Sequence, residues 1–304
     1  MNHGYGKVIL FGEHFVVHDL PAIVASLPWS TIASVRVLQN LDQKILLDDK
    51  RPRIPGVKYL ESKYHAYNQL AKNIVERMGI IDNLEITLAG DLVVSSGGIG
   101  ASAATAVALT RALNNFYNLN LPDNEIHEIA LHGERAVHGN PSGIDTTAAT
   151  YGGLFVFQKN KDIKFLDQTN STKIVLIDSG FTMPTSEVIT LVKKFKDNNP
   201  ELVNSIISHY KNIVQEAENN RDNLARLGAL MNENHELLRQ IGVSTPELDT
   251  IVSVACGAGA LGAKITGTGR GGLILALTSD DTQDRVAHAC QRLGYKILCT
   301  EMPI

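Results

Sequence analysis

"LVVSSGGIGASAATAVALTRALNNF", residues 92–116, passes from apolar residues through a glycine-rich turn into an alanine-rich helical pattern. The start of a helix has backbone N–H groups without partners and about half a positive charge, so phosphates bind there. Glycines let a backbone approach phosphate oxygens closely and adopt positive φ. We therefore expect a nucleotide phosphate cradle here, with a flexible turn and a serine cap as the alternative.

The cradle is not a P-loop, because no Lys-Ser or Lys-Thr pair follows the glycines at the required spacing. The hydroxyl of Ser102 could bind a phosphate or Mg²⁺. A second glycine run, residues 267–272, matches G-x-G-x-x-G, but a strand-like LILALT follows it instead of a helix. We interpret this run as a tight loop in which Arg270 reaches a phosphate or is simply solvated.

The composition is that of an ordinary soluble globular protein, with 304 residues of which 44% are hydrophobic and 20% charged. A net charge of −4 does not favour binding to nucleic acid or to an anionic membrane. Three cysteines are too few for a disulfide framework and fit a reducing compartment, so we expect a cytoplasmic protein. We expect no signal peptide and no membrane span. Oligomeric state is left open, a homodimer included.

Hydrophobic periodicity predicts an α+β protein in two lobes, 1–183 and 184–304. In the first lobe we predict strands over 5–11, 16–27, 31–38, 84–94 (interrupted at Gly90-Asp91), 151–157 and 173–178, and helices over 63–78 and 121–139. Residues 185–241 should be mostly helical, and Thr245 should cap the helix that follows. Three short strands over 262–266, 273–278 and 295–300 should end the chain, with a helix over 281–294 between the last two.

Three charged residues are candidates for chemistry. Glu134 shares a helical face with Ile126 and Ala130, and a carboxylate on an apolar face meets a cation, binds a metal or faces a cleft; a structural salt bridge is the alternative. The turn-forming segment HGNPSGID, residues 138–145, delivers Asp145 to the next segment, as a catalytic carboxylate or as a plain cap. Lys7 lies within an apolar strand and should pair with a carboxylate or a phosphate.

Several strings in order resemble one family, the GHMP kinases, named for galactokinase, homoserine kinase, mevalonate kinase and phosphomevalonate kinase. They are GKVILFGEHFVV, SSGGIGASAA, GERAVHGNPSGID and GALGAKITGTGRGG. The resemblance implies a ribosomal-S5-like N-terminal lobe, a ferredoxin-like C-terminal lobe and an active site in the cleft between them. It is nearest to the members that phosphorylate the 5-hydroxyl of mevalonate, which implies ATP and mevalonate as substrates and Mg²⁺ as cofactor.

The resemblance also assigns roles to individual residues. Asp145 would face the attacking hydroxyl with Lys7 beside it, and Ser102 and Glu134 would coordinate Mg²⁺. The ATP phosphates would be held by Ser95, Ser96, Gly97, Gly98, Ile99, Gly100, Ala101 and Ser102. The substrate would be bound by Glu13, His14, Thr185, Gly267, Thr268 and Gly269.

Three positions depart from the family pattern. Tyr5 stands where Pro is usual, Ala101-Ser102 replaces a double serine, and Arg270 stands where glycine is common. Two other interpretations stay open: another kinase of the family, acting on phosphomevalonate or homoserine, and a non-catalytic protein that keeps the fold. The second should have lost catalytic side chains, yet Lys7, Ser102, Glu134 and Asp145 are all present.

Overall fold

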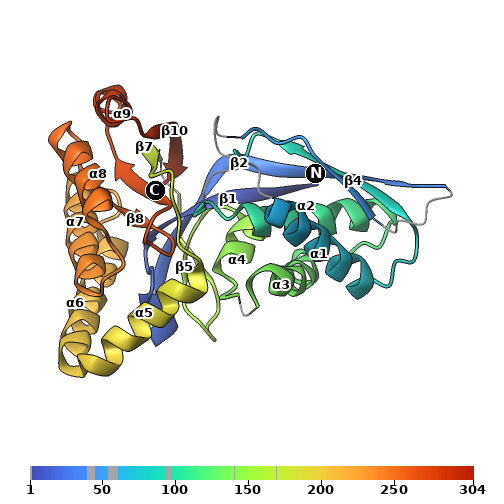
Figure 1. The fold of residues 1–304 in the computed structure, drawn as a ribbon, viewed down its shortest axis with the longest axis horizontal. Coiled ribbons are helices and arrows are strands. Elements are labelled where there is room, and N and C mark those ends of the chain that lie inside the picture. Colours follow the sequence, from blue (N-terminus) through green and yellow to red (C-terminus); the bar gives the residue numbers. More distant parts are fainter. Residues whose placement is uncertain (1, 40–44, 54–60, 94–96, 140, 169) are drawn as a thin grey trace. The chain divides into compact units, whose positions relative to one another are not determined.

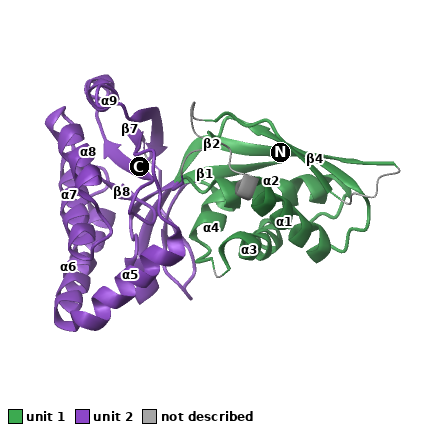
Figure 2. Cartoon of the chain, viewed as in Figure 1, with its two compact units in different colours: residues 1–7, 26–95, 99–152 green, residues 8–25, 96–98, 153–304 purple. Residues whose placement is uncertain are grey.

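A computed structural model describes residues 2–39, 45–53, 61–93, 97–139, 141–168 and 170–304. The chain forms two compact units built from interleaved segments (Figure 2). Unit 1 comprises residues 1–7, 26–95 and 99–152, and unit 2 comprises residues 8–25, 96–98 and 153–304. The two lobes that we expected to divide at residue 183 stay a prediction.

Unit 1 packs helices on one face of its strands (Figure 1). The second half of β2 (Ala22–Val37) pairs antiparallel with β4 (Leu84–Gly90), and β3 (Ile45–Asp49) pairs parallel with β4. The helices are α1 (Glu61–Arg77), α2 (Ala101–Phe116), α3 (Asp123–His138) and α4 (Ile144–Tyr151). Strand β1 (His3–Phe11) pairs with β2 and, like β2, continues from one unit into the other.

The alanine-rich helix α2 lies in the core of unit 1. It is buried along most of its length and shares one apolar cluster with α1, α3 and the inner face of the strands. Small side chains allow this close packing: a methyl group at Gly4 of β1 would lie 2.2 Å from the Ala104 carbonyl oxygen. The core therefore fixes where the N-terminal end of α2 lies against β1.

Unit 2 is built on an antiparallel sheet in the order β10-β7-β9-β8. Its strands are β7 (Ser171–Asp178), β8 (Gly262–Thr266), β9 (Leu273–Leu277) and β10 (Lys296–Pro303). Its helices are α5 (Thr185–Asn198), α6 (Pro200–Asn219), α7 (Leu224–Gln240), α8 (Pro246–Gly257) and α9 (Gln283–Gln291). The first half of β2 pairs with β5 (Leu154–Phe157), which pairs with β6 (Lys164–Phe165).

Most of the predicted elements are confirmed, but the strand predicted over 16–27 begins only at Ala22. Residues Phe15–His18 form a 3-10 turn, η1, because left-handed residues at His14 and Asp19, with φ of 61° and 57°, reverse the chain on either side. Segment 31–38 is extended to Val37 as predicted, and it joins 22–27 in one strand because β2 runs unbroken through Pro28. The pairing with β5 stops at Ala25 and the pairing with β4 starts at Thr31, so neither ladder needs the missing N–H of Pro28.

Two further boundaries differ from prediction. Strand β4 ends at Gly90, whose φ of 106° leaves the extended region, and no strand continues over 91–93. Strand β5 begins at Leu154 because Tyr151 ends α4. The helix cap at Thr245 is confirmed, since its side chain accepts the Leu248 N–H at 3.4 Å.

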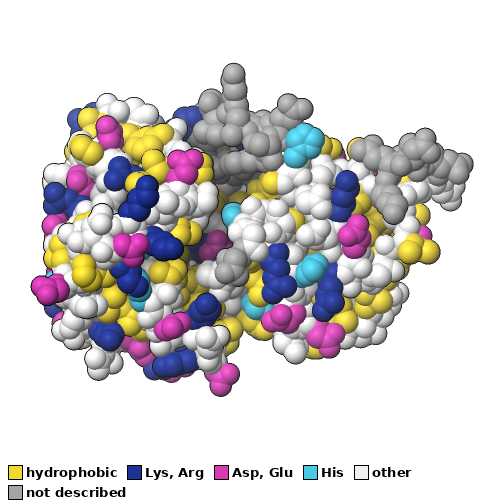
Figure 3. All heavy atoms as spheres, turned by 60° about the horizontal axis from the view of Figure 1, so that its bottom comes forward, with side chains coloured by type: hydrophobic (Ala, Val, Ile, Leu, Met, Phe, Trp, Pro, Cys, Tyr) yellow, Lys and Arg dark blue, Asp and Glu magenta, His cyan; other side chains and the backbone are white. Residues whose placement is uncertain are grey.

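Two further features of the molecule are the distribution of charged side chains on its surface and the length of its apolar helices. Figure 3 shows positively and negatively charged side chains interspersed over the face of each unit that it presents. In the part of the chain that the structure describes, no helix is both long and apolar enough to cross a membrane.

Candidate active site

The N-terminal end of α2 has the geometry of an anion site. Helix α2 follows the glycine-rich turn, as predicted, and begins at Ala101; the residue before it, Gly100, has φ of 71° and provides no side-chain cap. Gly97 and Gly98 also adopt positive φ, of 148° and 94°. A Cβ atom on Gly100 would lie 3.1 Å from Cγ of Lys7, so any other residue here would strain the backbone and crowd Lys7. Ser95 and Ser96 lie outside the described residues.

Lys7 and Asp145 form an ion pair beside this turn. Lys7 is 3% exposed on β1, and its Nζ lies 3.2 Å from Oδ1 of Asp145, whose side chain is 39% exposed. Asp145 lies in the first turn of α4, directly after Gly143 with φ of 88°. The predicted partner of Lys7 is therefore a carboxylate, and the pair presents that carboxylate at the surface of unit 1.

Ser102 and Glu134 lie together in the same unit. The Ser102 hydroxyl donates to Oε2 of Glu134 at 3.3 Å, and it lies 3.1 Å from Nε2 of His138. Glu134 is 2% exposed on the apolar face of α3 that the sequence predicted. Burial raises the pKa of Glu134 to about 8, the charge of Asp145 adds to the rise, and the Ser102 hydroxyl opposes it.

The surroundings of Glu134 fit a bound cation. Its Oε1 is buried without a hydrogen-bond partner, and in the described residues no Lys or Arg pairs with it. His138 is a poor substitute, because burial lowers its pKa and favours the neutral ring. A buried carboxylate and a neighbouring hydroxyl are oxygen ligands of the kind that Mg²⁺ takes together with substrate phosphates. The alternative of a structural salt bridge with Lys or Arg finds no support here.

The remaining candidates lie in unit 2, around the loop after β8. Nε2 of His14 lies 2.6 Å from the Thr268 carbonyl oxygen, and the Thr185 hydroxyl lies 3.3 Å from that of Thr268. Burial lowers the pKa of His14. Gly267 and Gly269 have φ of 97° and 79°. The structure thus brings His14, Thr185 and Thr268 together.

Glu13 differs from His14 and the two threonines, the other candidates of unit 2 that carry side chains, because its own side chain is fully buried. It accepts a hydrogen bond from Lys264 of β8, whose Nζ also donates to the Ile265 carbonyl. A buried ion pair needs such close pairing, because each charge loses its hydration. The pair ties the residue before His14 to the strand that leads into Gly267, while the expected place of Glu13 in a substrate pocket stays a prediction.

The side chain of Arg270 is not simply solvated, because its Nε donates to the Gly242 carbonyl at 2.7 Å. Its own N–H donates to the Val243 carbonyl at 2.7 Å. The residue therefore anchors the glycine loop to the chain that follows α7.

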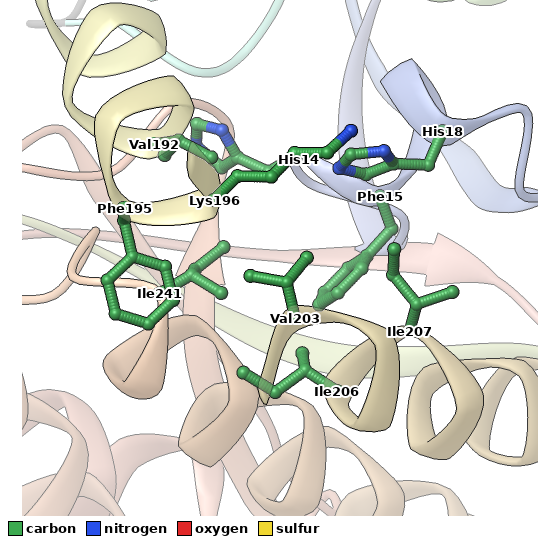
Figure 4. A pocket seen from close by; sticks show the side chains of 10 residues that line it. All are labelled: His14, Phe15, His18, Val192, Phe195, Lys196, Val203, Ile206, Ile207 and Ile241. Carbon is green, nitrogen blue, oxygen red and sulfur yellow. The ribbon is translucent and has the colours of Figure 1, made fainter. Parts of the chain in front are cut away.

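A small pocket lies beside His14 in unit 2 (Figure 4). His14, His18 and Lys196 lie on one side of it, and the other lining side chains are apolar: Phe15, Val192, Phe195, Val203, Ile206, Ile207 and Ile241. Its volume of about 20 Å³ holds roughly one water molecule. We therefore do not assign it to a substrate.

Sequence reasoning missed two residues that touch the candidates. His138 lies one helical turn after Glu134, and this i,i+4 spacing was a signal that could have placed it beside Ser102. Lys264 pairs with a residue 251 positions away, and only its lone charge within the apolar strand GAKIT indicated a buried partner.

Comparison with known proteins identifies the family. A profile described as GHMP kinases N terminal domain matches residues 64–153, and one described as GHMP kinases C terminal matches residues 210–296. Together they cover more than half of the chain. This chain is a GHMP kinase. The matched segments contain Ser102, Glu134 and Asp145.

Relatives of this GHMP kinase include proteins of known name. A mevalonate kinase of Pyrococcus furiosus is 32% identical over 97% of this chain and 94% of its own length. The crystal structure of L. major mevalonate kinase in complex with R-mevalonate matches with a TM-score of 0.93 and 39% identity, over 99% of this chain and 95% of that one. A Streptococcus pneumoniae phosphomevalonate kinase matches 99% of each chain with a TM-score of 0.76, but at 14% identity it supports the fold alone.

Proposed function

We propose that this GHMP kinase transfers the γ-phosphoryl group of ATP to the 5-hydroxyl of mevalonate, giving 5-phosphomevalonate for isoprenoid precursor synthesis. The observation that carries the proposal is the Lys7–Asp145 pair next to the buried Glu134 in unit 1. The Pyrococcus furiosus and L. major proteins, which are named mevalonate kinases, support mevalonate as the acceptor. Its cytoplasmic location and its oligomeric state, a homodimer included, stay predictions.

The N-terminal end of α2 would bind the phosphates of ATP. Its first-turn N–H groups and the positive φ of Gly100 provide the donors and the close approach that phosphate oxygens need. Ser102 and Glu134 would hold Mg²⁺. When bound there, Mg²⁺ supplies the positive charge that offsets the phosphate charge during transfer. The raised pKa of Glu134 indicates the same need for a cation.

Asp145 and Lys7 would act on the acceptor. The hydroxyl oxygen forms a bond to the γ-phosphorus while the bond between that phosphorus and the β–γ bridging oxygen breaks, and the hydroxyl proton must leave. Asp145 either accepts this proton as a general base or only orients the hydroxyl. Lys7 holds the Asp145 carboxylate at 3.2 Å and adds positive charge where the transferring group carries negative charge.

Residues of unit 2 would recognise mevalonate. We assign this role to His14, Thr185, Thr268 and the flanking Gly267 and Gly269, because their hydroxyls, ring and backbone can hydrogen-bond a small hydroxy acid. Glu13 supports them through its buried pair with Lys264. That these residues and those of unit 1 serve one cleft stays a prediction.

An acceptor panel tests the proposal. ADP release is measured with ATP, Mg²⁺ and one acceptor at a time: mevalonate, phosphomevalonate or homoserine. We expect the highest kcat/KM with mevalonate, and ³¹P NMR should identify the product as 5-phosphomevalonate. A preference for phosphomevalonate or homoserine would overturn the choice of substrate, and ADP release that no acceptor accelerates would overturn the proposed transfer to a small-molecule hydroxyl.

A further inference from the structure

Arg51, just after β3, is a buried guanidinium that the proposed chemistry does not use. Its side chain is 0% exposed, and that of Asp49 is 3% exposed. Nε donates to Oδ1 of Asp49 at 2.9 Å and Nη2 donates to Oδ2 at 2.7 Å, which is a bidentate pair. The ring of Tyr67 lies below the guanidinium, with its centroid 5.0 Å from Cζ. The orientation of the guanidinium is therefore fixed from two sides.

The third nitrogen of Arg51 reaches the first turn of α2. Nη1 donates to the Thr105 hydroxyl at 2.9 Å and approaches the Ala101 carbonyl oxygen at 3.4 Å. The Thr105 hydroxyl itself donates to that carbonyl at 2.8 Å. Nη1 also donates to the hydroxyl of Thr31 on β2 at 3.1 Å. Arg51 thus links the turn at Ala101 to two strands of the sheet.

This link adds to the close packing of α2 against β1 and to the bond from the Lys7 N–H to the Ile99 carbonyl, because the turn has no side-chain cap of its own. The residue before it, Gly100, offers no side-chain cap, and Ala101 has no side chain long enough to anchor it. Backbone N–H groups bind phosphate well only if they are held within about half an ångström of the productive geometry. The hydroxyl of Ser102, the next residue, must be positioned with the same precision.

We propose that Arg51 is a positioning residue that holds the first turn of α2, and with it Ser102, in the geometry that binds the phosphates of ATP. The inference rests on the proposed function of that turn. Arg51 does not act by attracting the nucleotide, because the carboxylate of Asp49 already balances its charge. It acts through Thr105, so loss of that hydroxyl should weaken nucleotide binding even when Arg51 is present.

Two isosteric variants test this. Thr105→Val and Thr110→Val each remove a buried hydroxyl of α2 that donates to the carbonyl four residues earlier, at 2.8 Å in both cases. Only Thr105 also accepts from Arg51. Calorimetric titration with Mg²⁺ and ATP should show about a tenfold higher Kd in Thr105→Val and a Kd within about twofold of the parent in Thr110→Val, with similar losses of thermal stability. Equal nucleotide affinities in the two variants would overturn the proposal.

Arg51→Lys provides a second test, since it keeps the positive charge but loses the planar guanidinium that contacts Asp49 and Thr105 at the same time. We expect it to raise the KM for ATP about tenfold and to leave the KM for the acceptor within about twofold. A purely structural residue would affect both substrates alike, and that result would overturn the proposal.

The titration needs no acceptor, so a parent enzyme that binds ATP but does not phosphorylate mevalonate would refute the proposed function without deciding the role of Arg51.

Discussion

Replacement of Glu134 by glutamine should stabilise the protein and impair its activity at the same time. Without a bound cation, the buried Glu134 is held with a pKa of about 8, well above the ordinary carboxyl value. Glutamine has nearly the same shape and never carries a charge. The variant therefore removes the cost of burying this carboxylate and also removes the proposed metal ligand.

The size of the effect follows from the pKa shift. An unfolded glutamate loses its proton near pH 4.5, whereas the folded one keeps it up to about pH 8. Folding stability from this group is fully present below the unfolded pKa and falls as the pH rises, by about 1.4 kcal/mol per pH unit. At pH 7 the cost is about 3 kcal/mol, and it grows until about pH 8. Glu134→Gln should recover most of that cost.

Urea unfolding in EDTA at pH 5, 6, 7 and 8 measures this directly. We expect Glu134→Gln to gain little at pH 5 and about 3 kcal/mol at pH 7. The control is Glu128→Gln on the same helix, whose side chain is 70% exposed and which should change little at any pH. Mg²⁺ with ATP should then stabilise the parent more than Glu134→Gln. A difference in the free energy of unfolding between the parent and Glu134→Gln that does not change with pH, or no difference at all, would refute the reasoning.

Three further predictions concern other residues. Asp145→Asn should lower kcat by about a hundredfold or more while Kd for ATP stays within a few-fold, as stopped-flow turnover and titration would show; near-normal turnover would remove Asp145 from the chemistry. Lys264→Met should destabilise the protein by about 3–5 kcal/mol because it removes the cation that pairs with the buried Glu13 carboxylate, and Glu13→Gln added to it should recover much of that loss in urea unfolding; failure to recover would mean that the ion pair is not the cause. Gly100→Ala should weaken binding of ATP about tenfold, because it strains a left-handed residue and crowds Lys7; an unchanged Kd in calorimetry would show that the turn tolerates a side chain.

Local sequence signals predicted the elements that carry chemistry in unit 1. The alanine-rich pattern after the glycine turn predicted α2, and helical spacing put Glu134 on the buried face of α3 with Ile126. Turn-forming residues before Asp145 predicted that it opens the next segment, which the structure shows to be helix α4. In each case a short segment determines its own backbone conformation, so the residues adjacent in the sequence are enough to predict it.

Contacts between distant segments were not predictable in this way. The pair of Glu13 with Lys264 joins residues 251 positions apart, and the link from Arg51 to Thr105 joins residues 54 positions apart. Residues 16–18 of the turn η1 were mistaken for the start of a strand, because the apolar residues there give no sign of the ring of Tyr210 that stacks on Phe15 at 4.0 Å. Tertiary packing, rather than local preference, decides all three.

A crystal structure with Mg²⁺ and a non-hydrolysable ATP analogue tests the central claim most directly. We expect the phosphates to accept hydrogen bonds from N–H groups at the start of α2, with Mg²⁺ about 2.1 Å from the Ser102 hydroxyl and from a Glu134 oxygen. Phosphates bound away from that turn, or a metal ion that touches neither Ser102 nor Glu134, would contradict the account.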